Sequence, residues 1–200
     1  MNSSDKLVET AKPMETTLVS QVGTEEPLVP MIAFDAIDLP TANECLRRWG
    51  HKMGPLARGK QSAWCHGLIV NGKVAAVTTA SYLIAPVVGG GLRHLTRINT
   101  LELSRLCAER SGLCRVAIRL WREFVFPQLP FQFAISYQDA DLHRGHTYRF
   151  DGWQRVGRAK SGPDTRSGRP GRDKWVWLWP PQVHEVNVVS TALAKHQENP

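Results

Sequence analysis

The sequence predicts an α/β domain in which a mixed sheet is covered by helices. Three observations carry this prediction. Segments with the period of a strand alternate with segments with the period of a helix, residues 63–81 read as a hairpin, and residues 111–126 read as an amphipathic helix followed by a strand. With 200 residues, the chain has the length of one domain with its own core.

The first elements are a strand over residues 31–37 and a helix directly after it. Asp38 or Thr41 is placed to cap the start of this helix, and Gly50 ends it. Apolar residues at helical spacing predict its core face: Ala42, Cys45, Leu46 and Trp49.

The hairpin prediction depends on Asn71-Gly72, a pair that tolerates the positive φ angles of a type I′ turn between two β-rich runs. Three glycines follow at positions 89–91. A flexible loop is the favoured interpretation, and a close approach of the backbone to a ligand is the other.

Residues 98–109 begin as a strand, because Leu101 and Leu103 alternate with polar residues. The next apolar residue, Leu106, comes three positions after Leu103, so the period slips. A β-bulge explains this slip, and so does a strand that passes directly into a helix.

The helix predicted over residues 111–126 has an apolar stripe of Leu113, Val116, Ala117, Leu120 and Phe124. Arg115, Arg119 and Arg122 line another of its faces, where a solvated surface is favoured over an anion-binding one. Pro127 and Pro130 end the helix.

The remaining elements are a strand over residues 131–137, a short helix or turn, a strand beginning near residue 154 and a final strand over residues 174–179. The order favours a mixed sheet. Residues 154–174 carry seven basic and two acidic side chains, the densest positive stretch of the chain.

Composition separates the domain from its ends. All 16 aromatic residues lie within residues 31–180, so we expect residues 1–30 to be a disordered acidic tail and residues 181–200 a flexible tail. The tails have net charges of −3 and −1, which leaves +11 on residues 31–180 out of a total of +7. A basic domain suits polyanions or the phosphates of a coenzyme, although solubility alone also explains it.

The cysteines and the apolar segments indicate the compartment. Cys45, Cys65, Cys107 and Cys114 show no metal-binding spacing and read as buried thiols of a reducing compartment. We find neither a membrane-spanning segment nor a signal peptide, so we expect a cytoplasmic protein.

Two places could carry chemistry. A helix that starts at Ser111-Gly112 offers unpaired backbone N–H groups to a phosphate or pyrophosphate. Asp139 follows a strand and Tyr148 lies nine residues on, where a carboxylate could accept a proton from an amine and a phenol could donate one to a thiolate. The competing interpretation is a capping Asp and a packed Tyr.

Together with a bulged central strand, the Ser111-Gly112 helix start resembles the way in which GNAT acyltransferases hold acyl-CoA. The resemblance implies a mostly antiparallel sheet with a splayed pair of strands, flanked by helices. It implies acetyl-CoA or a related acyl-CoA held by Leu106, Cys107, Ala108, Ser111, Gly112 and Leu113. The usual signature is Arg or Gln, two residues, Gly, one residue, then Gly or Ala. Here Arg110 is followed by Ser111, Gly112 and Leu113, so the first glycine is shifted and the second is absent.

A more specific resemblance follows from motifs over about residues 45–158. These are "ELSRLC" (102–107), "ISYQD" (135–139), the set His143, Gly145, Tyr148 and Arg149, the pair Gly152-Trp153, and His51 with Pro55. In order and spacing they resemble phage Mom-type DNA-modification proteins. That family is associated with converting adenine in DNA to a carbamoylmethyl derivative, which protects DNA from restriction.

The Mom-type resemblance implies double-stranded DNA as partner and a role for Asp139, Tyr148 and Ser136 in catalysis. It implies substrate contacts from His51, Arg105 and Arg149. The arginine-rich loop that follows predicts further DNA contacts from Arg166, Arg169 and Arg172. Iron has been considered for that family; possible ligands are His51, His66, Asp139, His143 and His146, but isolated histidines are more often surface or packing residues, and we predict no metal site.

Two other functions fit the sequence. The first is an acetyl-CoA-dependent N-acetyltransferase for a small-molecule or protein amine, which would be expected to have an acidic substrate groove. The second is a nucleic-acid-binding module that kept the scaffold and lost the coenzyme.

Overall fold

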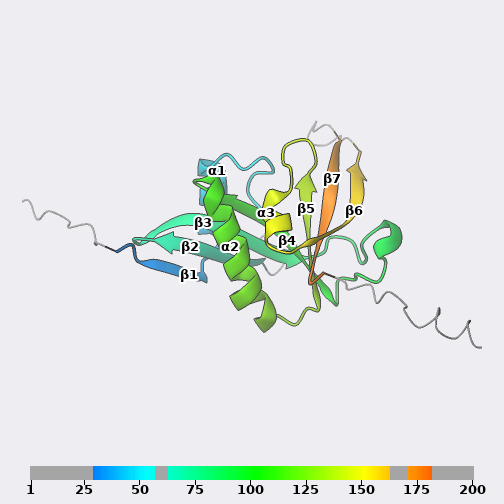
Figure 1. The fold of residues 1–200 in the computed structure, drawn as a ribbon, viewed down its shortest axis with the longest axis horizontal. Coiled ribbons are helices and arrows are strands. Elements are labelled where there is room, and N and C mark those ends of the chain that lie inside the picture. The colour runs from blue at the N-terminus through cyan, green and yellow to red at the C-terminus, as the bar shows by residue number, and fades with distance from the viewer. Residues whose placement is uncertain (1–28, 57–62, 163–170, 182–200) are drawn as a thin grey trace, which may run out of the picture.

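The computed structural model describes residues 29–56, 63–162 and 171–181. Within these ranges, seven strands form one sheet in the order β1-β2-β3-β4-β5-β7-β6 (Figure 1). The strands are β1 (Ile32–Ala36), β2 (Ala63–Val70), β3 (Lys73–Tyr82), β4 (Thr100–Ala108), β5 (Phe133–Asp139), β6 (Gln154–Ser161) and β7 (Arg172–Trp179). Only β4 and β5 pair in parallel, so the sheet is mixed and mostly antiparallel, as predicted.

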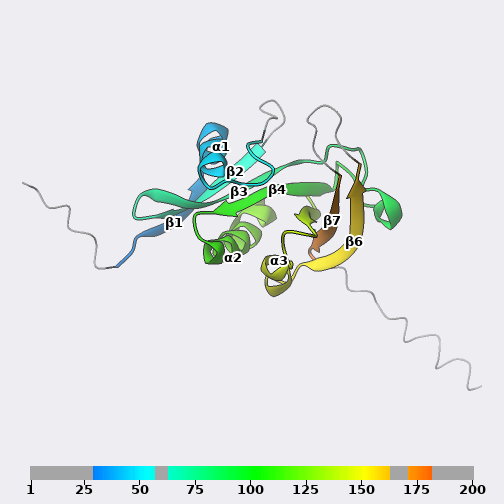
Figure 2. The ribbon, with the colours of Figure 1, turned by 90° about the horizontal axis from the view of Figure 1, so that it is seen from above.

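The helices cover both faces of this sheet (Figure 2). Helix α1 (Leu39–Arg48) lies on one face, and α2 (Ser111–Leu120) and α3 (His146–Phe150) lie on the other. The α/β prediction is therefore confirmed. No helix in the described ranges is long and apolar enough to cross a membrane.

Local signals set the first elements where the sequence predicts them. The Asp38 carboxylate accepts a 2.8 Å hydrogen bond from the Thr41 N–H, so Asp38 is the cap of α1, and Gly50 follows the helix with a φ of +62°. In the hairpin, Asn71 and Gly72 have φ angles of 49° and 75°, as a type I′ turn requires. The three-glycine segment ends in a short 3₁₀ turn, η1 (Gly90–Leu92).

The period slip in residues 98–109 is a β-bulge. Arg105 pairs with Thr79 and Leu103 pairs with Ala80, so Ser104 is the extra residue on β4. The bulge reverses the alternation of side chains, and both Leu103 and Leu106 therefore pack in the core on the α2 side of the sheet. Of the two explanations of the slip, the bulge is confirmed.

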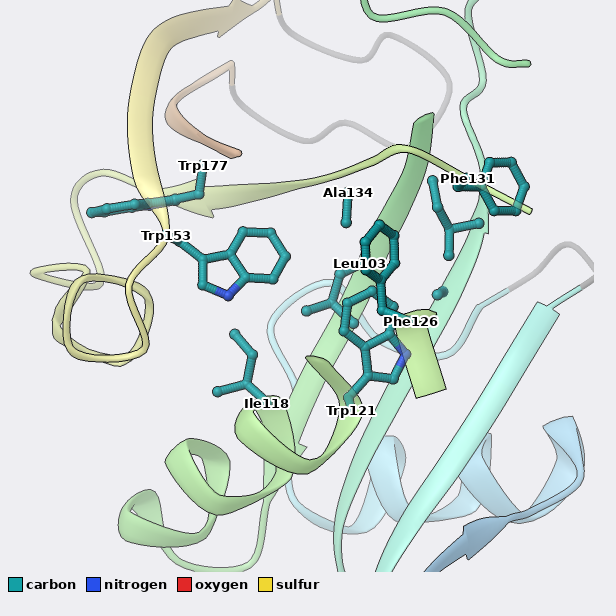
Figure 3. Packing of buried hydrophobic residues seen from close by; sticks show 10 residues of the cluster. Leu103, Ile118, Trp121, Phe126, Phe131, Ala134, Trp153 and Trp177 are labelled. Carbon is teal, nitrogen blue, oxygen red and sulfur yellow. The ribbon is translucent and has the colours of Figure 1, made fainter. Parts of the chain in front are cut away.

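The predicted apolar stripe of the 111–126 helix is only partly right, since Ala117 is buried but Val116 and Phe124 are not. Val116 is 43% exposed and Phe124 is 59% exposed, whereas Ile118, Trp121 and Phe126 are buried (Figure 3). Within α2 the buried face therefore lies one residue further along than predicted, at Ala117 and Ile118. Beyond α2 a π-helical turn, η2 (Trp121–Val125), in which the Phe126 N–H bonds to the Trp121 carbonyl, accounts for the exposure of Phe124 and the burial of Phe126. This turn shifts the helical phase, and a 3₁₀ turn, η3 (Phe126–Gln128), then ends the segment.

The arginines of this helix are not all solvated, as the prediction had favoured. Arg119 is exposed, but the Arg122 side chain is only 15% exposed. Its Nε donates to the Asp151 carboxylate at 3.0 Å, and its guanidinium lies 4.6 Å from the Trp179 ring centroid. Arg122 is therefore an internal ion-pair partner that joins the π-helical turn to the residue after α3.

Other predictions hold in part. All four cysteines are free thiols, but only Cys45 and Cys65 are buried, while Cys107 and Cys114 are half-buried. Strand β7 begins at Arg172, two residues before the predicted start. The predicted tails lie almost entirely outside the described residues.

Candidate active site at the divergence of β4 and β5

The centre of the sheet opens between β4 and β5. These strands pair only from Thr100 to Glu102, opposite Phe133 to Ile135. At the next position the Ser136 hydroxyl donates a 2.9 Å hydrogen bond to the Leu103 carbonyl, in place of a bond between the two backbones. From there to Ala108 the β5-facing edge of β4 has no strand partner.

The start of α2 lies just beyond this unpaired edge. Arg110 is the N-cap residue, no side chain caps the first turn, and that turn holds no acidic residue. Ser111 and Gly112 are exposed, and a Cβ at Gly112 would meet no atom within 4 Å. Unpaired N–H groups and the positive end of the helix dipole therefore face open space, an arrangement that suits a phosphate.

Tyr148 of α3 reaches the divergence from the α2 side of the sheet. Its hydroxyl lies 2.8 Å from the Ser136 Oγ, which itself donates to Leu103, so the phenol is the donor in this pair. Its ring stacks on Trp177 and meets Trp153 edge-on. Burial raises the pKa of Tyr148 to about 12, so the phenol stays protonated at neutral pH.

Gly145 allows α3 to come this close. It has a φ of +75°, and a Cβ there would lie 2.5 Å from Trp177 Cζ2 and 2.6 Å from Gln138 Oε1. Gln138 in turn accepts a 2.8 Å bond from the Trp177 indole N–H. The glycine therefore serves both the left-handed turn and the packing that holds Tyr148 in place.

Asp139 ends β5 as a turn cap. Its Oδ1 accepts hydrogen bonds of 3.1 Å from the N–H groups of Asp141 and Leu142, and its Oδ2 lies 3.4 Å from Arg172. Alternation along β5 places Asp139 on the opposite face of the sheet from Ser136, and hence from Tyr148. Both of its oxygens are engaged.

A cavity of about 480 Å³ opens on that opposite face, beside the divergence. Glu102 and Ser104 of β4 and Tyr137 of β5 line it, with an apolar wall that includes Leu83 and Val88. The pKa of Tyr137 is raised by burial and by the negative charge of Glu102. At the bulge, the Ser104 Oγ lies 2.7 Å from the Ser81 Oγ.

Sequence reasoning missed Glu102, Tyr137, Lys160 and Lys174, which all line this cavity. One signal was available for Glu102. It is a carboxylate in a central, otherwise apolar strand, two residues before the slip that marks the bulge.

Arg105 and His51 lie near each other on the cavity side. Arg105 lines the cavity, donating from Nε to the Gly54 carbonyl at 3.1 Å and from Nη1 to the Ser104 carbonyl at 2.8 Å. Burial lowers the pKa of His51 to about 4, helped by the positive charges of Arg105 and His143. The structure therefore brings His51, Arg105 and His143, all predicted candidates, close to one another.

The other candidates are dispersed. His66 stacks on Phe34 of β1, His146 pairs with Phe150 in α3, and Arg149 is exposed at the end of α3. In the described residues no group of three or more His, Cys, Asp or Glu side chains could hold a metal ion, and nothing here supports iron. Arg166 and Arg169 lie outside the described residues.

No protein-family model matches the chain, and neither does any curated protein sequence. Solved structures match in fold. The ribosomal-protein-S18-alanine N-acetyltransferase from Escherichia coli has a TM-score of 0.53 at 16% identity, over 79% of this chain and 99% of that one. NAA60 from Arabidopsis thaliana, in complex with acetyl-CoA, has a TM-score of 0.52 at 11% identity, over 74% and 98%.

A probable acetyltransferase from Staphylococcus epidermidis gives a TM-score of 0.53 at 10% identity, over 74% of this chain and 98% of that one. The chain therefore has the fold of GNAT acetyltransferases, as predicted. None of these structures is described as a DNA-modifying protein, so the Mom-type resemblance gains no support from them.

Proposed function

We propose that this chain is an acyl-CoA-dependent N-acyltransferase. The observation that carries the proposal is the divergence of β4 and β5 at Ser136 and Leu103, with a bulge on one strand, a phenol on one side and a carboxylate-lined cavity on the other. Such a gap lets a donor and an acceptor meet from opposite faces of the sheet.

The residues present fit an acyl-CoA on the α2 side. The unpaired edge of β4 over Leu106, Cys107 and Ala108 offers backbone groups to an amide-rich chain such as pantetheine. The uncapped first turn at Ser111 and Gly112 offers N–H groups to a pyrophosphate. One solved structure of similar fold holds acetyl-CoA, which supports this donor.

The acceptor would lie in the cavity, where Glu102 is positioned to act as general base. A bound acyl-CoA supplies an electrophilic thioester carbonyl and a thiol leaving group. Glu102 accepts the proton that the amine loses as the C–N bond forms. We assign this role to Glu102 rather than to Asp139, since Glu102 lines the cavity and Asp139 is held by a turn and by Arg172.

Tyr148 is positioned to act as general acid. Its phenol is protonated at neutral pH, and its hydrogen turns from the Ser136 Oγ to the sulfur and is transferred as the C–S bond breaks. Ser136 holds the phenol through their 2.8 Å contact and is itself fixed by the Leu103 carbonyl. The acid and the base therefore approach the divergence from opposite faces of the sheet.

A second candidate is the finer function expected from the sequence, modification of adenine in DNA. The favouring observation is the charge of the cavity: among the described residues, Arg105, Lys160 and Lys174 line it, and Glu102 is the one carboxylate among them. Cations around an acceptor site suit a polyanion better than a simple ammonium ion.

One experiment separates the two candidates. The purified protein is incubated with labelled acetyl-CoA and, in parallel, with peptide amines and with plasmid DNA. Label in a peptide amide together with release of free CoA supports the N-acyltransferase. Label recovered in a modified nucleoside after DNA digestion, with no labelled peptide, supports the second candidate. No transfer and no acetyl-CoA binding would refute both.

A further inference from the structure

Lys174 of β7 differs from the other lysines that the structure describes. It lines the cavity and is half-buried, whereas Lys52, Lys73 and Lys160 are exposed. The same cavity is lined by Glu102, the proposed base. A primary amine of the chain itself therefore lies in the space that we assign to the acceptor.

Alternation along β7 sets the face on which the Lys174 side chain lies. Lys174 shares a face with Val176 and Leu178, which pack against the apolar wall of the cavity. Lys160 also lines the cavity, but it is paired with Asp173, so its side chain lies on the other face of the sheet. Of these two lysines, Lys174 is therefore the one whose side chain lies on the cavity face.

The register places Lys174 directly across β5 from the divergence. Lys174 is paired with Asp139, and from Ser136 to Asp139 the other edge of β5 has no strand partner. Adjacent strands lie about 4.8 Å apart, and the four-carbon stem of a lysine reaches about 6 Å from its Cα. The Lys174 amine can therefore reach over β5 to its open edge, where the proposed function places the thioester.

The carboxylates beside Lys174 are held by arginines. Asp139, its partner across the strands, lies 3.4 Å from Arg172, and Asp173, its neighbour in the chain, pairs with Arg158. Among the residues that the structure describes, no carboxylate lies within ion-pair distance of Lys174. No salt bridge of the described residues therefore holds this amine away from the divergence.

From these observations, and resting on the proposed function, we infer that Lys174 is a site of self-acylation, which takes the acyl group when no external amine occupies the cavity. The ammonium group releases one proton to solvent, and Nζ then attacks the thioester carbonyl carbon. The C–N bond forms, the C–S bond breaks, and the electron pair of the C–S bond passes to the sulfur. Glu102 takes the proton that the nitrogen loses, and Tyr148 supplies a proton to the sulfur. The products are an amide at Lys174 and free CoA.

The test compares two acetyl donors on the whole protein without an added acceptor, with each lysine followed by peptide mapping and mass spectrometry. Succinimidyl acetate reacts with any accessible amine, so it should label the exposed Lys73 faster than the half-buried Lys174. Acetyl-CoA should invert this order and acetylate Lys174 at least about tenfold faster than Lys73, because the bound thioester is held next to one amine. At saturating acetyl-CoA this rate should not change on dilution of the protein, since the transfer takes place within one chain.

Two variants separate transfer within the site from ordinary chemical acetylation. Glu102→Gln should slow the acetylation of Lys174 by acetyl-CoA about 10³-fold and leave its labelling by succinimidyl acetate unchanged, which also shows that the variant is folded. Lys73→Arg, a matched change on the hairpin away from the cavity, should leave the acetylation of Lys174 at the wild-type rate. Equal rates at Lys174 and Lys73 with acetyl-CoA, or a rate at Lys174 that Glu102→Gln does not change, would overturn the inference.

Calorimetry with acetyl-CoA, together with an added peptide amine, separates this inference from the proposed function. If acetyl-CoA binds and the peptide is acetylated, but Lys174 stays unmodified even without the peptide, the inference fails and the proposed function stands. If acetyl-CoA does not bind and no amine is acetylated, both fail. Acetylation of Lys174 in the order and with the dependence on Glu102 given above supports both.

Discussion

The two faces of the sheet at the β4–β5 divergence differ in the burial and the charge of their polar side chains. On the α2 side, Ser136 and Tyr148 are neutral hydroxyls joined in one chain of hydrogen bonds and enclosed by Trp153 and Trp177. On the cavity side, the ionisable side chains of Glu102, Arg105 and Lys174 line an open space. The two faces of one sheet thus present a fixed site for proton donation and a charged site for an acceptor.

Burial and charge are divided between the two faces of one sheet. A phenol keeps its proton when it is buried, so the packed side suits an acid. A carboxylate keeps its charge where solvent or a counter-ion reaches it, so the open side suits a base.

The largest effect is expected from removing the base on the open side. Glu102→Gln should lower kcat about 10³-fold with the fold intact, because an amide of the same shape cannot accept the proton. Steady-state kinetics and urea unfolding measure the two properties.

Asp139→Asn is the matched control for Glu102→Gln. This variant should lose stability, by about 1 kcal/mol, because the turn and Arg172 lose a charged acceptor, and it should affect kcat far less. A larger loss of kcat in Asp139→Asn than in Glu102→Gln would return the role of base to Asp139.

A substitution at Gly145 disrupts the packing of the α2 side most directly. A Cβ there would strike Trp177 and Gln138 in a backbone with positive φ, so Gly145→Ala should cost on the order of 3 kcal/mol of unfolding free energy. Gly112→Ala, at a position with open space around it, should change stability by less than about 1 kcal/mol. Equal losses in urea unfolding would contradict the assigned packing.

On the cavity side, the lowered pKa of His51 predicts that the stability of the protein falls at acidic pH. Its pKa is lowered to about 4, below its ordinary 6.5, so the folded state disfavours the charged form. Its contribution is present above pH 6.5 and is lost as the pH falls toward 4, on the order of 2 kcal/mol by pH 5. His51→Gln should flatten this part of the stability curve; a curve parallel to that of the wild type would refute the assignment.

The smallest effect is expected from removing the phenol hydroxyl of Tyr148. Tyr148→Phe keeps the ring on Trp177 and should lower kcat about tenfold, because a thiolate is a good leaving group even without a proton donor. The pKa of Tyr148 is raised to about 12, so its contribution to stability is present below pH 10 and is lost as the pH rises toward 12. The variant should lack this alkaline loss, and its persistence would place the titration at another group.

Local signals in the sequence were enough for much of the fold. Asp38, Asn71-Gly72 and the slip between Leu103 and Leu106 act through neighbouring residues, and each led to the element that the structure shows. The predicted phase of the 111–126 helix was wrong already at Val116, which is exposed beside the buried Ala117 and Ile118. The π-helical turn that follows depends on how Phe126 packs and leaves no mark in the apolar pattern.

The site was predictable only in part. Ser136 and Tyr148 meet as the proposed arrangement requires, yet Glu102 was overlooked, since its importance depends on a cavity formed by strands and connections distant in sequence. Arg122 was taken for a surface residue because its partner, Asp151, lies 29 residues away.

The central claim is that coenzyme binds at the α2 side and the acceptor at the other, and calorimetry with acetyl-CoA tests it most directly. Gly112→Glu puts a negative charge in the first turn of α2, where the helix dipole favours it but a pyrophosphate would be repelled. We predict that acetyl-CoA binds the wild type and Glu102→Gln with equal affinity and binds Gly112→Glu at least about tenfold more weakly. Undiminished binding to Gly112→Glu, or no binding to the wild type, would contradict it.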